Sequence, residues 1–99
     1  MTKQVRRFRS TLGILNTEPT RMGDLHVDDR FVGPNEQAVY KVTADCASNT
    51  HGFLHVWNLT MADQDVRDLL DKHPAEYKDS HPRDGFFAYS TDTLLDRVI

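Results

Sequence analysis

The chain holds one cysteine and five histidines, residue types that serve as nucleophile, general base or metal ligand. Cys46 and His51 lie close together in the sequence, and a thiolate beside an imidazole is the core of cysteine-dependent catalysis. Such groups are assembled in space from separate elements, so proximity in the sequence is weak support for them. A Cys/His-dependent enzyme is therefore the weakest of three hypotheses, and we predict no catalytic residues.

A metal site is also not expected. His51 and His55 are four residues apart, a spacing that brings two ligands together on a helix. Their segment alternates like a strand, on which residues four apart are separated by about 13 Å. Cys46 and His51 alone would supply only two ligands. We predict no metal ion and no cofactor.

The sharpest local pattern is an aromatic stripe. Phe53, His55 and Trp57 alternate with Leu54 and Val56, so the two sets point to opposite faces of a strand. Either a following helix covers the stripe, or the stripe is exposed. If it is exposed, these aromatic side chains are anchors for a macromolecular partner. We name Phe53, His55 and Trp57 as candidate partner-binding residues.

Charge is unevenly distributed along the chain. Residues 1–21 carry five basic side chains and one acidic one, whereas residues 22–99 carry seven basic and fourteen acidic ones. A basic segment on an acidic body indicates contact with a charged partner. Two further candidate surfaces follow. One is acidic and comprises Asp65, Asp68 and Asp71, and the other is basic and comprises Lys3, Arg6, Arg7 and Arg9.

Period-two alternation predicts strands at 6–14, 30–32, 38–44, 52–58, 86–89 and 94–99. Pro19 predicts a loop over 16–20. Leu25 and Val27 are expected to anchor the next segment, and Asp28 and Asp29 to form a turn, since Asp tolerates a left-handed backbone.

A helix is predicted over residues 61–72. Ala62, Val66, Leu69 and Leu70 form one apolar stripe, and Thr60 has the side chain of an N-cap. His73-Pro74 ends the helix, and residues 73–84 are expected to form an exposed loop.

These elements predict a single α+β domain over 1–99. Residues 1–21 form a basic strand and loop. Residues 22–99 form a small, partly open antiparallel β-barrel of SH3-like or OB-like type, with about five strands and one amphipathic helix.

Residues 22–99 resemble a class of small bacteriophage-encoded β-barrel proteins. The resemblance rests on M-G-D-L-H-V-D-D-R-F at 22–31, V-Y-K-V at 39–42, V-W-N-L-T at 56–60 and F-A-Y-S-T-D-T-L-L-D-R-V at 87–98. Asp28 stands where that pattern has a turn glycine. The resemblance implies a phage origin, a cytoplasmic setting in the infected host and a binding role.

The main functional hypothesis is therefore a non-enzymatic binding protein that modulates a host or phage macromolecule as an inhibitor or adaptor. The alternative is nucleic-acid binding through the basic N-terminal strand. No apolar run approaches the roughly 20 residues of a membrane span, and no apolar signal region follows the basic start. We expect a cytoplasmic protein with a protein partner. A homodimer is compatible with this sequence.

Overall fold

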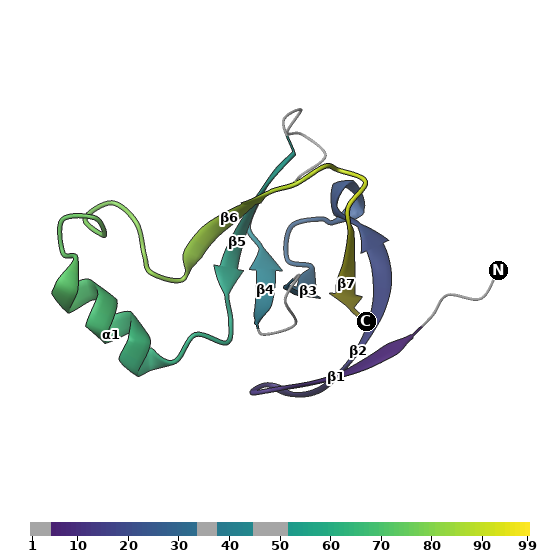
Figure 1. The fold of residues 1–99 in the computed structure, drawn as a ribbon, viewed down its shortest axis with the longest axis horizontal. Helices are drawn as coiled ribbons and strands as arrows, with labels where there is room; N and C mark the ends of the chain where they lie inside the picture. Colours follow the sequence, from purple (N-terminus) through teal and green to yellow (C-terminus); the bar gives the residue numbers. More distant parts are fainter. Residues whose placement is uncertain (1–4, 34–37, 45–51) are drawn as a thin grey trace.

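The computed structural model describes residues 5–33, 38–44 and 52–99. Within these residues, seven strands, one α-helix and one short 3₁₀ helix follow one another (Figure 1). In chain order they are β1 (Arg6–Ser10), β2 (Gly13–Arg21), η1 (Met22–Asp24), β3 (Arg30–Val32), β4 (Val39–Val42), β5 (Phe53–Asn58), α1 (Asp63–Lys72), β6 (Asp84–Ala88) and β7 (Leu94–Val98).

The strands form one antiparallel sheet in the order β1-β2-β7-β3-β4-β5-β6. The predicted mainly β, α+β fold with one helix is confirmed. The predicted barrel of about five strands is wrong, because the sheet has seven strands and does not close. Strands β1 and β6 remain its two outer members in the part of the chain that the structure describes.

The two additional strands arise mainly in the N-terminal segment, where one strand and a loop were predicted and strands β1 and β2 are observed. The predicted strand over 6–14 is broken by a two-residue turn at Thr11 and Leu12, which joins β1 to β2 as a hairpin. Gly13 has φ +103°, and the Ser10 hydroxyl accepts a hydrogen bond from the Leu12 N–H at 3.1 Å. Ser and Gly at these turn positions are a local signal that the alternation concealed.

Residues 16–20, predicted as a loop, lie inside β2. The Ile99 N–H donates to the Asn16 carbonyl at 2.9 Å, so Asn16 directs its backbone groups toward β7. Because this direction alternates along a strand, the nitrogen of Pro19 points toward the side of β1. Arg6 is the first paired residue of β1, so no ladder bond is required of Pro19. Proline is tolerated in a strand for this reason.

The main core cluster lies on one face of the sheet, and Val32 and Val39 are also buried, on the opposite face. The fully or nearly buried members of the main cluster are Met22, Leu25, Phe31, Val42, Leu54, Val56 and Leu95. Tyr40 and Phe87 pack against them, with ring centroids 5.0 Å apart and an edge-to-face geometry. Leu25 is confirmed as an anchor, whereas Val27 is exposed. Asp28 has φ 75°, which confirms the predicted left-handed turn residue.

The predicted helix over 61–72 is observed as α1, two residues shorter at its start. Its N-cap residue is Ala62, so the predicted Thr60 cap is wrong. The Thr60 hydroxyl instead accepts the Val39 N–H at 3.2 Å and donates to Asn58 Oδ1 at 3.0 Å. The Thr60 hydroxyl is therefore bonded to a residue of β4 and does not cap the helix.

The start of α1 is held by Arg83, whose guanidinium donates to the Met61 carbonyl at 2.5 Å and to Asp63 Oδ1 at 2.8 Å. In Figure 1 the helix lies to one side of the sheet, beyond β5 and β6. Among the described residues, no helix has the length and apolar character to cross a membrane.

Candidate partner-binding surface

The aromatic stripe of β5 lies on the face of the sheet opposite the core, here called the outer face. Leu54 and Val56 point into the core, so Phe53, His55 and Trp57 point outward. Phe86 of β6 is the direct partner of His55 and shares this face. The structure therefore adds a fourth aromatic side chain to the three that the sequence predicted.

Phe53, His55 and Phe86 form what we call the aromatic patch. Phe86 is 61% exposed and Phe53 37% exposed. Their rings meet edge to face at 5.7 Å, and the His55 ring lies 6.3 Å from Phe86. Of the two predicted alternatives, exposure is correct for Phe53 and His55, because α1 lies beside the sheet and leaves them in solvent (Figure 1).

Trp57 lies in a different environment. It is partly buried, and its ring stacks on His81 at 4.8 Å with an interplanar angle of 25°. His81 belongs to the loop that precedes β6. The loop therefore covers part of Trp57, so this residue borders the aromatic patch and presents less surface to a partner.

Sequence reasoning missed Phe86 as a candidate. Phe86 and Phe87 are adjacent in a strand, so one must face the core and the other must face away. Phe87 faces the core. A register between the strands at 52–58 and 86–89 would have placed Phe86 beside His55, but that register depends on a pairing of distant segments.

The predicted acidic surface is present on α1 but separate from the aromatic patch. Asp65, Asp68 and Asp71 are all exposed, and Asp68 accepts a hydrogen bond from the Gln64 amide at 3.0 Å. The helix position in Figure 1 places them to the side of the sheet. They can attract a basic surface, but they do not extend the aromatic patch.

The predicted basic residues are divided between two faces of the β1–β2 hairpin. Arg6 forms an ion pair with Asp96 at 3.4 Å. Arg7 and Arg9 point to the opposite face and are exposed. Lys3 lies outside the described residues, as do Cys46 and His51.

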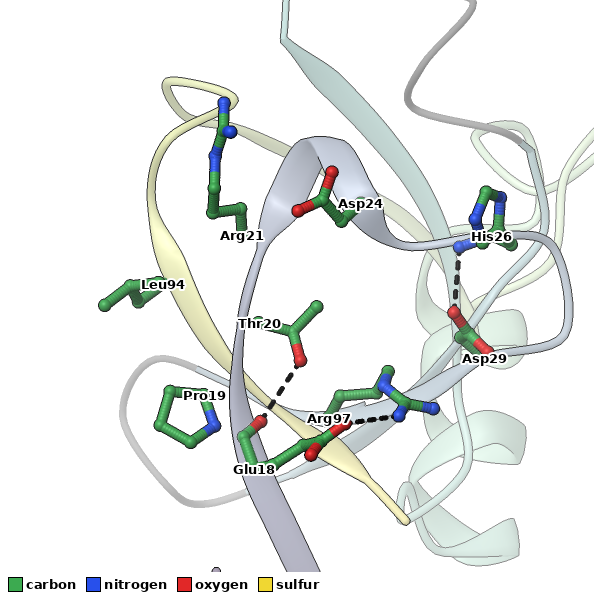
Figure 2. Close-up of a pocket in the computed structure, with 9 residues that line it drawn as sticks. All are labelled: Glu18, Pro19, Thr20, Arg21, Asp24, His26, Asp29, Leu94 and Arg97. Carbon is green, nitrogen blue, oxygen red and sulfur yellow. Dashed lines mark hydrogen bonds and ion pairs between the residues drawn. The ribbon is translucent and has the colours of Figure 1, made fainter. Parts of the chain in front are cut away.

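A cleft of about 510 Å³ opens between β2, β7 and the segment that follows η1 (Figure 2). Three of its charged side chains, Glu18, Arg97 and Arg21, take part in ion pairs. Glu18 is 9% exposed and accepts a hydrogen bond from Arg97 at 2.5 Å, whereas Arg21 pairs with Asp92. The cleft has a mixed polar and apolar lining, and its Glu18–Arg97 pair joins β2 to β7 as part of the fold.

The contact between His26 and Asp29 in this cleft involves the backbone of His26. Asp29 accepts the backbone N–H of His26 at 2.9 Å, so this contact caps a turn and does not orient the imidazole (Figure 2). Within residues 5–33, 38–44 and 52–99, no group of three or more His, Cys, Asp or Glu side chains is arranged to hold a metal ion. No protein-family model, curated protein or solved structure matches the chain.

Proposed function

We propose that this is a small non-enzymatic binding protein whose partner, a host or phage protein, docks on the aromatic patch. The observation that carries the proposal is the exposed edge-to-face pair of Phe53 and Phe86. Solvent-exposed aromatic side chains that lie together on a rigid strand pair lose little conformational entropy on binding. They therefore make efficient interface anchors.

The surroundings of the patch support a protein partner. The paired backbones of β5 and β6 carry the patch, and the exposed carboxylates of α1, to the side of the sheet, can attract a basic partner surface. The resemblance of residues 22–99 to small phage proteins supports a role as inhibitor or adaptor in the infected cell.

A quantitative affinity-capture experiment tests this proposal. The full-length protein and a Phe53→Ser/Phe86→Ser variant are used as baits in host lysate, with captured proteins measured by mass spectrometry. Leu94→Ser is the matched control, because Leu94 is 65% exposed but belongs to β7. We expect a partner that the control retains and the double variant does not. Equal retention by all three baits would contradict the proposal.

The β1–β2 hairpin supports nucleic-acid binding as a second candidate function. Arg6, Arg7 and Arg9 are the only charged side chains among residues 5–16, and a two-stranded ribbon fits the major groove of DNA. An Arg7→Ala/Arg9→Ala variant should bind more weakly, with a log–log salt slope lower by roughly 0.7–0.9 for each phosphate that it no longer neutralises. Absence of DNA and RNA binding by the wild type at low salt would eliminate this candidate.

A further inference from the structure

The two outer strands of the sheet differ in how well they are protected against pairing. Strand β1 carries three arginines, a common device against edge-to-edge association. Strand β6 reads Asp-Gly-Phe-Phe-Ala, with one charge at its first residue and no proline. An apolar, uncharged edge strand is a template for another strand.

The hydrogen-bond phase shows which backbone groups of β6 face outward. Asn58 donates to the Arg83 carbonyl at 2.8 Å, and Tyr89 donates to the Gly52 carbonyl at 3.2 Å. These bonds bracket the β5–β6 ladder, so Gly85 and Phe87 bond to β5. The N–H and C=O groups of Phe86 and Ala88 therefore point away from β5, toward the outer edge.

We propose that β6 pairs with β6 of a second copy of this chain, antiparallel and about a two-fold axis at Phe86. This inference rests on the backbone edge of β6 and is independent of the proposed function. The two Phe86 residues exchange both backbone hydrogen bonds. Each Ala88 N–H donates to the Asp84 carbonyl of the other copy. The Asp84 N–H is already bonded to the His81 carbonyl at 2.9 Å and takes no part.

This register is self-complementary in charge and shape. It places Asp84 opposite Ala88, so the only charged residue of β6 does not meet its own copy. It also places the two Phe86 side chains side by side on the outer face, which joins the aromatic patches of both copies across the dimer. Cross-strand aromatic pairs of this kind stabilise a sheet.

The other edge pairings are disfavoured. Two β1 strands about a two-fold axis would set Arg7 against Arg9 or against itself, which brings like charges together. A β1–β6 pairing would be head-to-tail and would generate a ring or an open filament, not a two-fold dimer. Of these pairings, only β6–β6 forms a two-fold dimer in which no two like charges face each other.

The test measures both mass and local protection. When the protein concentration is raised from about 10 µM to about 1 mM, the average mass in sedimentation velocity should rise from 11.4 kDa toward twice that value. Over the same range, hydrogen exchange of the Phe86 and Ala88 amides should slow. The Gly85 and Phe87 amides, which bond to β5, serve as internal controls whose exchange stays constant.

Ala88→Pro removes an outward N–H and no bond to β5, so we expect about a tenfold or larger rise in the dimer dissociation constant. Arg7→Pro likewise removes an outward N–H, but from β1, and should leave dimerisation unchanged. Circular dichroism verifies that both variants fold. A monomer at all concentrations would overturn the proposal. So would dimerisation that Ala88→Pro preserves, or Phe86 and Ala88 exchange that is independent of concentration.

Discussion

At the scale of single residues, the ion pair between Glu18 and Arg97 is the most enclosed charged contact described. Glu18 is 9% exposed, and the pair joins β2 to β7 at directly opposed positions. Removing one partner from such a pair leaves the other charge poorly solvated, which costs more than the pair itself contributes.

We expect Glu18→Gln to lower the free energy of unfolding by about 2–3 kcal/mol, less than for a fully buried pair because Arg97 retains some solvent contact. Urea denaturation monitored by circular dichroism measures the change. Asp92→Asn is the matched control, since the Arg21–Asp92 pair is well exposed and should change stability by less than about 1 kcal/mol. A similar loss in both variants would contradict the assignment of Glu18 as the enclosed partner.

Tyr40 links stability to alkaline pH. Burial, and to a lesser extent the nearby Tyr89, raises the pKa of the Tyr40 phenol above its ordinary value of 10.0. The folded state therefore holds this proton more tightly than the unfolded chain. The associated stability is complete below pH 10.0 and is lost as pH rises through the higher folded pKa.

We expect the free energy of unfolding of the wild type to fall more steeply above about pH 10 than that of Tyr40→Phe. Denaturant titrations at a series of alkaline pH values give these slopes. Tyr77→Phe, which removes a phenol hydroxyl from the loop after α1, is measured alongside as the matched substitution. Identical slopes for Tyr40→Phe and the wild type would show that another group controls the alkaline limb.

The stacking of Trp57 on His81 makes a prediction about fluorescence. The chain has a single tryptophan, so tryptophan emission reports on the surroundings of Trp57, which include this contact. We expect His81→Ala to increase quenching of that emission by acrylamide and to destabilise the protein by about 1 kcal/mol. The imidazole of His55 contacts Phe86, so His55→Ala should leave the quenching of Trp57 unchanged. Unchanged quenching in His81→Ala would mean that His81 does not cover Trp57.

At the scale of elements, two glycines with positive φ separate backbone strain from crowding. Gly52 precedes β5 at φ +72°, and a Cβ placed there would lie 2.3 Å from the Tyr89 carbonyl oxygen. Gly13 opens β2 at φ +103°, with nothing within 4 Å of the same position. Both share the cost of positive φ, but only Gly52 adds a clash with backbone.

Gly13→Ala should therefore cost about 1–2 kcal/mol of unfolding free energy, and Gly52→Ala about 3 kcal/mol or more. Thermal and urea denaturation of the two variants provide the comparison. Equal losses would indicate that φ alone sets the cost and that the approach of Tyr89 to Gly52 is not tight.

At the scale of the whole molecule, the sheet has a central region and two appendages. Strands β3, β4, β5 and β7 carry most of the core, whereas the turn end of the β1–β2 hairpin and helix α1 extend away from it (Figure 1). Overall extents of 50 × 33 × 19 Å match this flat, elongated arrangement. Segments with few buried side chains open at lower free energy than the core.

Native-state hydrogen exchange should therefore distinguish these regions. We expect amides of α1 and of the hairpin around Gly13 to exchange by local opening, well below the free energy of global unfolding. Amides of β4 and β5 should exchange near the global value. A single opening free energy for all protected amides would show that the appendages unfold together with the core.

The sequence by itself determined the features that depend on local periodicity. Alternation located β3, β4, β5, β6 and β7, and a 3.6-residue period located α1, because side-chain direction repeats along a chain whatever lies beyond it. The outward direction of Phe53 and His55 followed from the same rule.

Only the tertiary structure decided which strands are neighbours. Strand β7 pairs with both β2 and β3, and Pro19 lies in β2 at a position where no ladder bond is needed. Thr60 bonds to Val39 and does not cap α1, and Phe86 contacts Phe53. Each of these features depends on residues that are distant in the chain. Such contacts depend on how the sheet packs as a whole. Periodicity within one segment carries no information about them, and the open sheet and exposed aromatic patch therefore emerged from the fold.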